Sequence, residues 1–198
     1  YMKAGSHRQE QGQLEALRRV ALVPMPEVYA AYDADHVTPF DAIVMEYLDG
    51  CNAGVVEGLA PESRDNIALT IVENLLAYHR CVNPEGFGEL DAAAFAPDWN
   101  QSYWATAQSH FAKAQKLYDG GRIDAEVWGV VCRAMAHYDE IFCRPVPQAC
   151  LIHGDYNTWN VLLNDSMTEV AAVIDPSGCR WADPELDLYQ LNNANGRD

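Results

Sequence analysis

The chain has 198 residues, 49% of them hydrophobic, and its 29 acidic and 13 basic residues leave a formal net charge of −16. This apolar content is typical of a folded chain with one core or two small lobes around a cleft, and it argues against disorder. No run approaches the ~20 apolar residues of a membrane-spanning helix. The acidic charge disfavours nucleic acid and anionic lipid as partners but would attract a cationic small molecule.

The cysteines show no pattern of a metal site or a disulfide framework. No two form a Cys-x-x-Cys pair, and no histidine lies at zinc-ligand spacing from them. The N-terminus lacks the basic-then-apolar pattern of a secretion signal. We therefore expect a cytoplasmic protein with reduced thiols at Cys51, Cys81, Cys132, Cys143, Cys150 and Cys179.

Residues 1–49 predict a small β/α lobe. Tyr1-Met2-Lys3 resembles the end of a strand. Apolar positions recur at helical spacing over residues 9–20, and prolines then end the helix. Residues 28–31 and 42–48 are β-like and are closed by Asp49-Gly50. These elements together predict an N-terminal β/α unit that ends near residue 49.

Residues 50–198 predict a second, mostly helical lobe. Helical periodicity is found over residues 63–81, 100–118 and 124–142. Short apolar runs with polar turns follow over residues 149–152, 160–163 and 170–174, and they predict small strands around a loop-rich site. Because loops held by a rigid scaffold carry most chemistry, we expect the functional residues between His153 and Asp187.

Two carboxylates and an amide in this region point to chemistry. In the loop that begins His153-Gly154-Asp155, Asn160 follows the aspartate by five positions. A carboxylate at Asp155 can accept the proton of an attacking hydroxyl, while an amide oxygen at Asn160 can bind a metal ion in the same cavity. Asp175 ends the next strand and supplies a second oxygen ligand, which suits Mg²⁺ bound to a nucleotide.

These motifs resemble the family of aminoglycoside phosphotransferases, choline kinases and fructosamine kinases. The resemblance rests on His153-Gly154-Asp155 with Asn160, on Ile174-Asp175-Pro176, and on the run Asp183-Pro184-Glu185-Leu186-Asp187-Leu188. It implies an α+β, two-lobed protein-kinase-like fold and an ATP-dependent transfer of the γ-phosphate to a hydroxyl of a small molecule. Asp155 would be the catalytic residue, Asn160 and Asp175 would bind Mg²⁺, and Asp187 would brace the catalytic loop.

The same resemblance assigns upstream positions to nucleotide binding. Lys3 matches the lysine that pairs with the α- and β-phosphates of ATP, and the backbone from Glu46 to Leu48 matches the hinge that binds adenine. The glutamate that should pair with Lys3 is ambiguous, because the position counted from the helix falls on Gln13. Glu10 and Glu15 lie nearby, and Glu15 is favoured.

The chain also departs from the family pattern. The glycine-rich strand pair that should precede Lys3 is missing, and the chain stops where further substrate-binding helices are expected, as in a fragment. A catalytically silent, nucleotide-binding pseudokinase is therefore the principal alternative. A metal-dependent hydrolase built on His153, Asp155 and Asp175 is a further one, although such sites usually need more histidines.

The acceptor stays open between a fructosamine, an aminoglycoside and a choline-like molecule. His153 is expected to have a structural role, with hydrogen bonds to the backbone near Asp175, rather than a catalytic one.

Overall fold

The computed structural model describes residues 7–34 and 39–193. Its first element is helix α1 (His7–Arg18), which lies within two residues of the predicted start and end. The N–H groups of Val20 and Ala21 both donate to the carbonyl of Leu17, and the helix ends before Pro24. The predicted strand at Lys3 lies outside the described residues.

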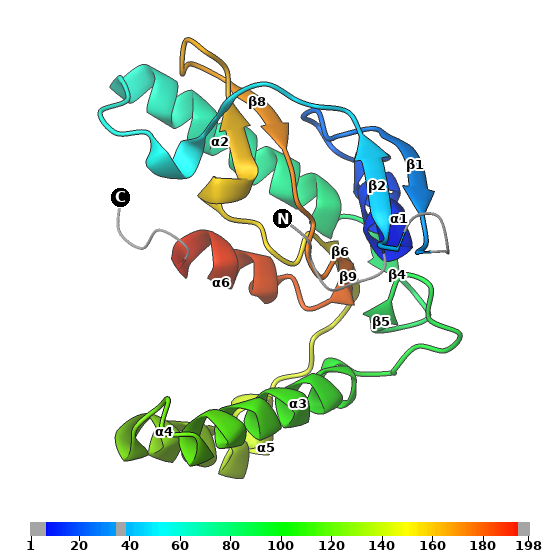
Figure 1. The fold of residues 1–198 in the computed structure, drawn as a ribbon, viewed down its shortest axis with the longest axis vertical. Helices are drawn as coiled ribbons and strands as arrows, with labels where there is room; N and C mark the ends of the chain where they lie inside the picture. Colours follow the sequence, from blue (N-terminus) through cyan, green and yellow to red (C-terminus); the bar gives the residue numbers. More distant parts are fainter. Residues whose placement is uncertain (1–6, 35–38, 194–198) are drawn as a thin grey trace.

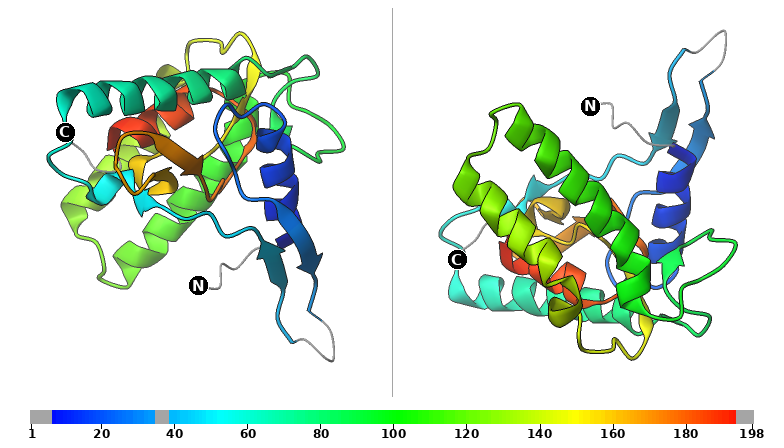
Figure 2. Two further views of the ribbon diagram at one scale, coloured as in Figure 1. Left: turned by 90° about the horizontal axis from the view of Figure 1, so that it is seen from above. Right: turned by 90° about the horizontal axis from the view of Figure 1, so that it is seen from below.

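Two strands follow α1 and form an antiparallel arm that projects from the rest of the molecule (Figure 2). They are β1 (Val28–Tyr32) and β2 (Ala42–Met45). The predicted second strand continued to residue 48, but the last ladder pair joins Val28 to Met45. Beyond it the Glu46 N–H donates to the carbonyl of Glu27 at 2.7 Å, and the chain leaves the ladder.

The remaining strands form two further antiparallel sheets. One has the order β3-β7-β8 and the other the order β4-β6-β9-β5. Strands β6, β7 and β8 match the three predicted runs, whereas the other four were not predicted. The bounds are β3 (Cys51–Asn52), β4 (Val82–Asn83), β5 (Gly88–Glu89), β6 (Ala149–Ile152), β7 (Val161–Leu163), β8 (Val170–Val173) and β9 (Arg180–Ala182).

Some of the helices lie beside these sheets, and the others lie apart from them (Figure 1). Helix α2 (Pro61–His79) and the C-terminal helix α6 (Glu185–Asn193) lie beside the sheets, while α3, α4 and α5 form a separate layer. Two short 3-10 turns complete the fold, η1 (Ala53–Val55) and η2 (Thr158–Asn160).

Two helices of the α3–α5 layer begin at capping aspartates. Helix α3 (Trp99–Asp119) and helix α4 (Ala125–Ala136) are preceded by Asp98 and Asp124, whose side chains accept hydrogen bonds from backbone N–H groups in the first turn. The predicted helix over residues 124–142 is interrupted, because His137 departs from helical angles and a short helix α5 (Tyr138–Ile141) follows.

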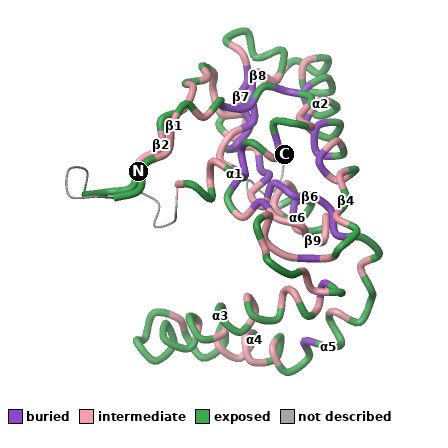
Figure 3. The backbone as a smooth tube through the Cα atoms, turned by 90° about the vertical axis from the view of Figure 1, so that its right-hand side faces the viewer, coloured by how far each residue is buried: buried purple, intermediate pink, exposed green. Residues whose placement is uncertain are grey.

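The main core lies where α1 and α2 pack on β6, β7 and β8, and the buried residues concentrate there (Figure 3). A smaller core around Phe87 and Trp99 joins α3 to the four-stranded sheet. None of the six cysteines forms a disulfide in this structure. Among the described residues, no helix is both long and apolar enough to cross a bilayer.

Candidate active site

The predicted catalytic loop, residues 153–160, connects strands of different sheets. It leaves β6 of the four-stranded sheet and enters β7 of the three-stranded sheet. Neither ladder holds the loop itself, so its conformation depends on other contacts. Three residues anchor it: Asp187 on α6, His153 of the loop itself, and Gly154, which lies against the turn after β8.

Asp187 on α6 is the first anchor. Its Oδ2 accepts the N–H of His153 at 2.9 Å, and its Oδ1 accepts the N–H of Gly154 at 2.8 Å. His79 on α2 adds a contact of 3.2 Å from its Nε2 to Oδ2. The carboxylate is fully buried, and hydrogen bonds to a charged acceptor are stronger than neutral ones. This geometry confirms that Asp187 braces the loop.

His153 is the second anchor, and both of its ring nitrogens are engaged. Nε2 lies 3.1 Å from the carbonyl of Ile174, and Nδ1 accepts the N–H of Asp155 at 3.3 Å. These partners require the neutral ring with its proton on Nε2. Complete burial lowers the pKa of His153 and favours the same neutral form. The predicted structural role is confirmed, and neither nitrogen is available to a metal in a hydrolase site.

Gly154 is the third anchor, because it allows a close approach to the turn after Asp175. Its φ of 85° lies in the left-handed region, and a Cβ placed there would be 2.5 Å from the carbonyl carbon of Gly178. Any other residue would push the loop away from this turn. The glycine of the motif therefore keeps the loop against the segment that carries the second carboxylate.

Two amides hold the side chain of Asp155 in place. Asn157 donates its Nδ2 to Oδ1 at 2.9 Å, and Asn160 donates its Nδ2 to Oδ2 at 3.0 Å. The same Nδ2 groups also lie 3.2 and 2.8 Å from the Asp155 carbonyl. Each carboxylate oxygen can accept more than one hydrogen bond, so both can still accept a proton from a ligand.

The strand pair β7–β8 brings Asn160 next to Asp175. Val161 pairs with Val173, and the Ile174 N–H donates to the Asn160 carbonyl at 2.9 Å. Asp175 follows at once with a φ of 57°, a left-handed conformation that side chains rarely adopt. Strained residues of this kind concentrate at functional sites. Asp155, Asn160 and Asp175 are thus gathered at one place.

The donor set at this place suits Mg²⁺. Because Asn160 commits its Nδ2 to Asp155, its oxygen is the atom left for a metal. Asp175 would add a carboxylate, and Mg²⁺ needs only one or two protein ligands beside water and phosphate. No group of three or more His, Cys, Asp or Glu side chains that could hold a metal occurs in the part of the chain that the structure describes.

Of the residues expected to bind nucleotide near the N-terminus, only those on α1 lie within the described part of the chain. Lys3 lies outside the described residues, so its partner stays a prediction. On α1 the Glu15 side chain is exposed and accepts a hydrogen bond from Gln11 at 2.8 Å. Gln13 faces the interior and donates to the carbonyl of Cys179 at 3.4 Å. Glu10 forms an ion pair of 3.5 Å with His7 on the same helix.

The predicted hinge follows β2 without regular structure. Glu46 forms two hydrogen bonds with Glu27. Its N–H donates to the Glu27 carbonyl, and its carboxylate accepts the Glu27 N–H at 3.2 Å. Leu48 is half-buried. Gly50 then passes so close to β7 that a Cβ there would lie 2.7 Å from the carbonyl oxygen of Leu163. The hinge residues are therefore fixed at both ends.

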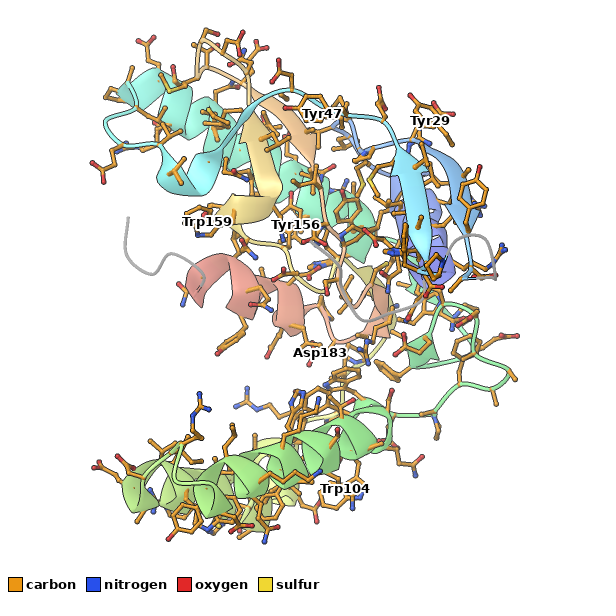
Figure 4. All side chains as sticks on the ribbon, in the orientation of Figure 1. Tyr29, Tyr47, Trp104, Tyr156, Trp159 and Asp183 are labelled. Atoms are coloured by element: carbon orange, nitrogen blue, oxygen red, sulfur yellow. The ribbon has the colours of Figure 1, made fainter. Side chains whose placement is uncertain are left out.

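Sequence reasoning missed three side chains of this site. Asn157 was not predicted as a second clamp on Asp155, although an Asn before a helical turn is a recognisable cap, and it does cap η2. No motif in the sequence pointed to the contact of His79 with Asp187. Asn74 on α2 had no signal, because its partners Leu22 and Tyr156 lie far away in the sequence. Figure 4 shows Tyr156, one of these partners, beside the more peripheral Trp159.

Comparisons with known proteins agree with this geometry. The chain is 24% identical over 195 residues to the protein YcbJ of Escherichia coli, covering 94% of this chain and 62% of that protein. Aminoglycoside phosphotransferase APH(3'')-Id from Streptomyces rimosus, solved with ADP and streptomycin, matches with a TM-score of 0.63 and 16% identity, over 94% of this chain and 65% of that one.

A thermostable mutant of aminoglycoside phosphotransferase APH(4)-Ia, in a ternary complex with AMP-PNP and hygromycin B, matches with a TM-score of 0.65 and 20% identity. That match covers 92% of this chain and 59% of the other. These likenesses establish the α+β, protein-kinase-like fold that the motifs implied. A model of the phosphotransferase enzyme family matches residues 3–198, and the chain therefore belongs to the phosphotransferase enzyme family.

Proposed function

We propose that the protein is an ATP-dependent small-molecule kinase that transfers the γ-phosphate to an alcohol group. One observation carries this proposal. The Asp155 carboxylate is held by two amides, and one of them, Asn160, is adjacent across β7–β8 to the strand end that presents Asp175. A positioned carboxylate beside two oxygen donors for a metal is the arrangement that phosphoryl transfer requires.

In this proposal Asp155 orients or deprotonates the acceptor hydroxyl. Its carboxylate cannot rotate freely, because a hydrogen bond from an amide reaches each oxygen. A carboxylate held in this way lowers the activation barrier of the transfer, because it is already oriented before the reaction begins. Asn160 and Asp175 would hold Mg²⁺, which neutralises charge on the phosphates when it is bound. His153 would stay neutral and keep the loop in shape.

The nucleotide would lie between the β1–β2 arm and the catalytic loop. Adenine would use the Glu46 carbonyl or the Leu48 N–H, since the Glu46 N–H already donates to Glu27. Lys3 would pair with the α- and β-phosphates, with Glu15 as its proposed partner. Two of the solved relatives are complexes with ADP or AMP-PNP, which supports an adenine nucleotide, whereas another aminoglycoside phosphotransferase is a complex with GDP and kanamycin.

The acceptor would be a small, cationic molecule with a free hydroxyl. The formal net charge of −16 favours a cation, and the solved relatives bind streptomycin or hygromycin B. An aminoglycoside, a fructosamine and a choline-like molecule all fit this description. Shared fold alone does not choose between them.

A second candidate function is a pseudokinase that binds nucleotide without turnover. The observation in its favour is Gln13, which is buried on α1 and donates to the Cys179 carbonyl. It faces the interior where the resemblance places the carboxylate partner of Lys3, whereas Glu15 is exposed. An amide there would hold the lysine less firmly than a carboxylate would.

The test is ADP formation from Mg·ATP by the full-length protein with a panel of amines, amino sugars and aminoglycosides. Asp155→Asn should lower turnover by about 10² to 10⁴-fold, the usual contribution of a positioned general base. Asp165→Asn, an exposed change of the same charge in the β7–β8 turn, should have no effect. Nucleotide binding without acceptor-dependent ADP would favour the pseudokinase, and no nucleotide binding would refute both.

A further inference from the structure

A polar junction is buried in the main core, away from the residues assigned to chemistry. Asn74 on α2 is completely buried, and its neighbours along the helix, Ile71 and Leu75, are core residues. Burying an amide in such surroundings is unfavourable unless its donors and acceptors are all paired. The amide of Asn74 is fully paired, and its partners come from three separate parts of the chain.

The oxygen of Asn74 binds the segment between α1 and β1. Oδ1 accepts the N–H of Leu22 at 2.8 Å and that of Val23 at 3.4 Å. The next residue of this segment is also held, since the Pro24 carbonyl accepts the N–H of Val173 on β8 at 3.0 Å. The segment that follows α1 is thereby joined both to α2 and to the strand that leads to Asp175.

The nitrogen of Asn74 binds two tyrosines. Nδ2 donates to the hydroxyl of Tyr78 at 2.9 Å and to the hydroxyl of Tyr156 at 3.2 Å. Tyr78 in turn donates to the Sδ of Met25 at 3.3 Å, and Tyr156 donates to the carbonyl of Ile71 at 2.9 Å. Each partner thus fixes the direction of the next hydrogen bond.

One end of this set is the catalytic loop. Tyr156 follows Asp155 directly and is fully buried, so its position limits that of the carboxylate. The ring of Tyr156 also meets His153 edge-on, with centroids 5.3 Å apart, and Tyr78 stacks on His153 at 6.4 Å. We call Asn74, Tyr78, Tyr156, the backbone of residues 22–24 and the side chain of Met25 the Asn74 network.

We propose that Asn74 is a positioning residue that couples the segment after α1 to the catalytic loop. An apolar side chain could fill the same volume, but only an amide supplies two acceptor and two donor contacts to three segments at once. A fully satisfied buried network rigidifies the elements that it joins. A displacement of α1 would therefore reach Asp155 through Leu22, Asn74 and Tyr156.

Hydrogen–deuterium exchange tests this coupling without any need for turnover. Asn74→Leu is the direct variant, and it can fail to fold because it leaves the N–H groups of the segment unpaired. Tyr78→Phe is the decisive variant, since it removes only the hydroxyl that links Asn74 to Met25 and leaves the loop contacts of the ring in place. Exchange is measured over residues 19–27 and 153–160.

We expect Tyr78→Phe to increase exchange in both segments by about five-fold, the factor that corresponds to one neutral hydrogen bond. Ile67→Val is the matched control, because it removes a buried methyl from the same helix and none of the hydrogen-bonding groups of the network. Exchange in residues 153–160 that rises no more in Tyr78→Phe than in the control overturns the proposal.

The effect on catalysis rests on the proposed kinase function. Tyr156→Phe should lower kcat about five-fold and leave the KM of the acceptor unchanged, whereas Ile67→Val should change neither. The two proposals fail separately. Absence of turnover in the wild-type protein refutes the kinase, while the exchange experiment still decides whether the Asn74 network couples the two segments.

Discussion

Replacing Asp187 by asparagine is expected to disturb the catalytic loop more than any other change of a single atom. The carboxylate accepts the N–H groups of His153 and Gly154, one on each oxygen, and it is fully buried. In Asp187→Asn one of these positions becomes an NH₂ group that faces an N–H donor. Whichever way the amide turns, one buried backbone N–H loses its acceptor.

The magnitude follows from these contacts. An unpaired buried N–H costs about 1–3 kcal/mol, and the remaining hydrogen bond loses the strength that the charge provides, about 1 kcal/mol. We expect a total near 3 kcal/mol. Because single domains are stable by only about 5–15 kcal/mol, the variant should fold but with a clearly lower midpoint.

The assay is urea unfolding followed by circular dichroism, together with turnover of Mg·ATP below the transition. Glu185→Gln makes the same chemical change at an exposed position of the same helix and should stay within about 0.5 kcal/mol of wild type. Kinase activity of Asp187→Asn should fall at least about ten-fold, because the loop that carries Asp155 loses an anchor. Equal unfolding free energies for the two variants would refute this reasoning.

Three further predictions concern the same loop and its surroundings. Burial places the pKa of His153 below the 6.5 of an ordinary histidine, so the unfolded chain takes up the proton first. The contribution of neutral His153 to the unfolding free energy is then complete above about pH 6.5 and falls by up to about 1.4 kcal/mol per pH unit below it. In urea titrations at pH 5 to 7, His153→Gln should remove this slope. In thermal unfolding, Gly154→Ala should destabilise the protein far more than Gly58→Ala. Both glycines have positive φ, but only at Gly154 would the added Cβ lie 2.5 Å from another backbone atom. Equal losses of stability would contradict this clash. Burial raises the pKa of the Cys179 thiol, so native-state iodoacetamide should label exposed Cys143 and spare Cys179, as read by mass spectrometry.

The catalytic loop could be recognised from the sequence because its parts are close together in the chain. Asp155 and Asn160 share one loop, and hydrogen bonds from Asn160 reach both the carbonyl and the carboxylate of Asp155. The roles of these residues in catalysis and metal binding stay predictions. The division of the chain at residues 49 and 50 into two lobes also stays a prediction.

The short strands could not be recognised in the same way. Strands β3, β4 and β5 are two residues long and β9 is three, which is too short for an alternating pattern. Cys51 pairs with Leu163, and Gly88 pairs with Trp181, so each partner is distant in the sequence. Pairs this distant leave no pattern among neighbouring positions, and such local patterns are what a sequence shows.

Packing also decided which side chains of α1 point into the core. The sequence left Glu10, Gln13 and Glu15 as possible partners of Lys3, because the family position counted along the helix falls on Gln13 and the two glutamates lie nearby. In the folded chain Gln13 shares the buried face with these leucines, and Glu15 is exposed. Gln13 and Glu15 are two positions apart and therefore lie about 200° apart around the helix, so only one of them can face the interior.

By itself the sequence determined the helices with strong periodicity, the three apolar strands around the site, and the order of the motifs that identify the family. These features depend on neighbours within a few positions, where local preferences and spacing suffice. Only the tertiary structure decided how the loop is held. Asp187 reaches back to His153, and Asn74 joins Leu22 to Tyr156, because buried polar groups must find partners wherever the packed chain brings them.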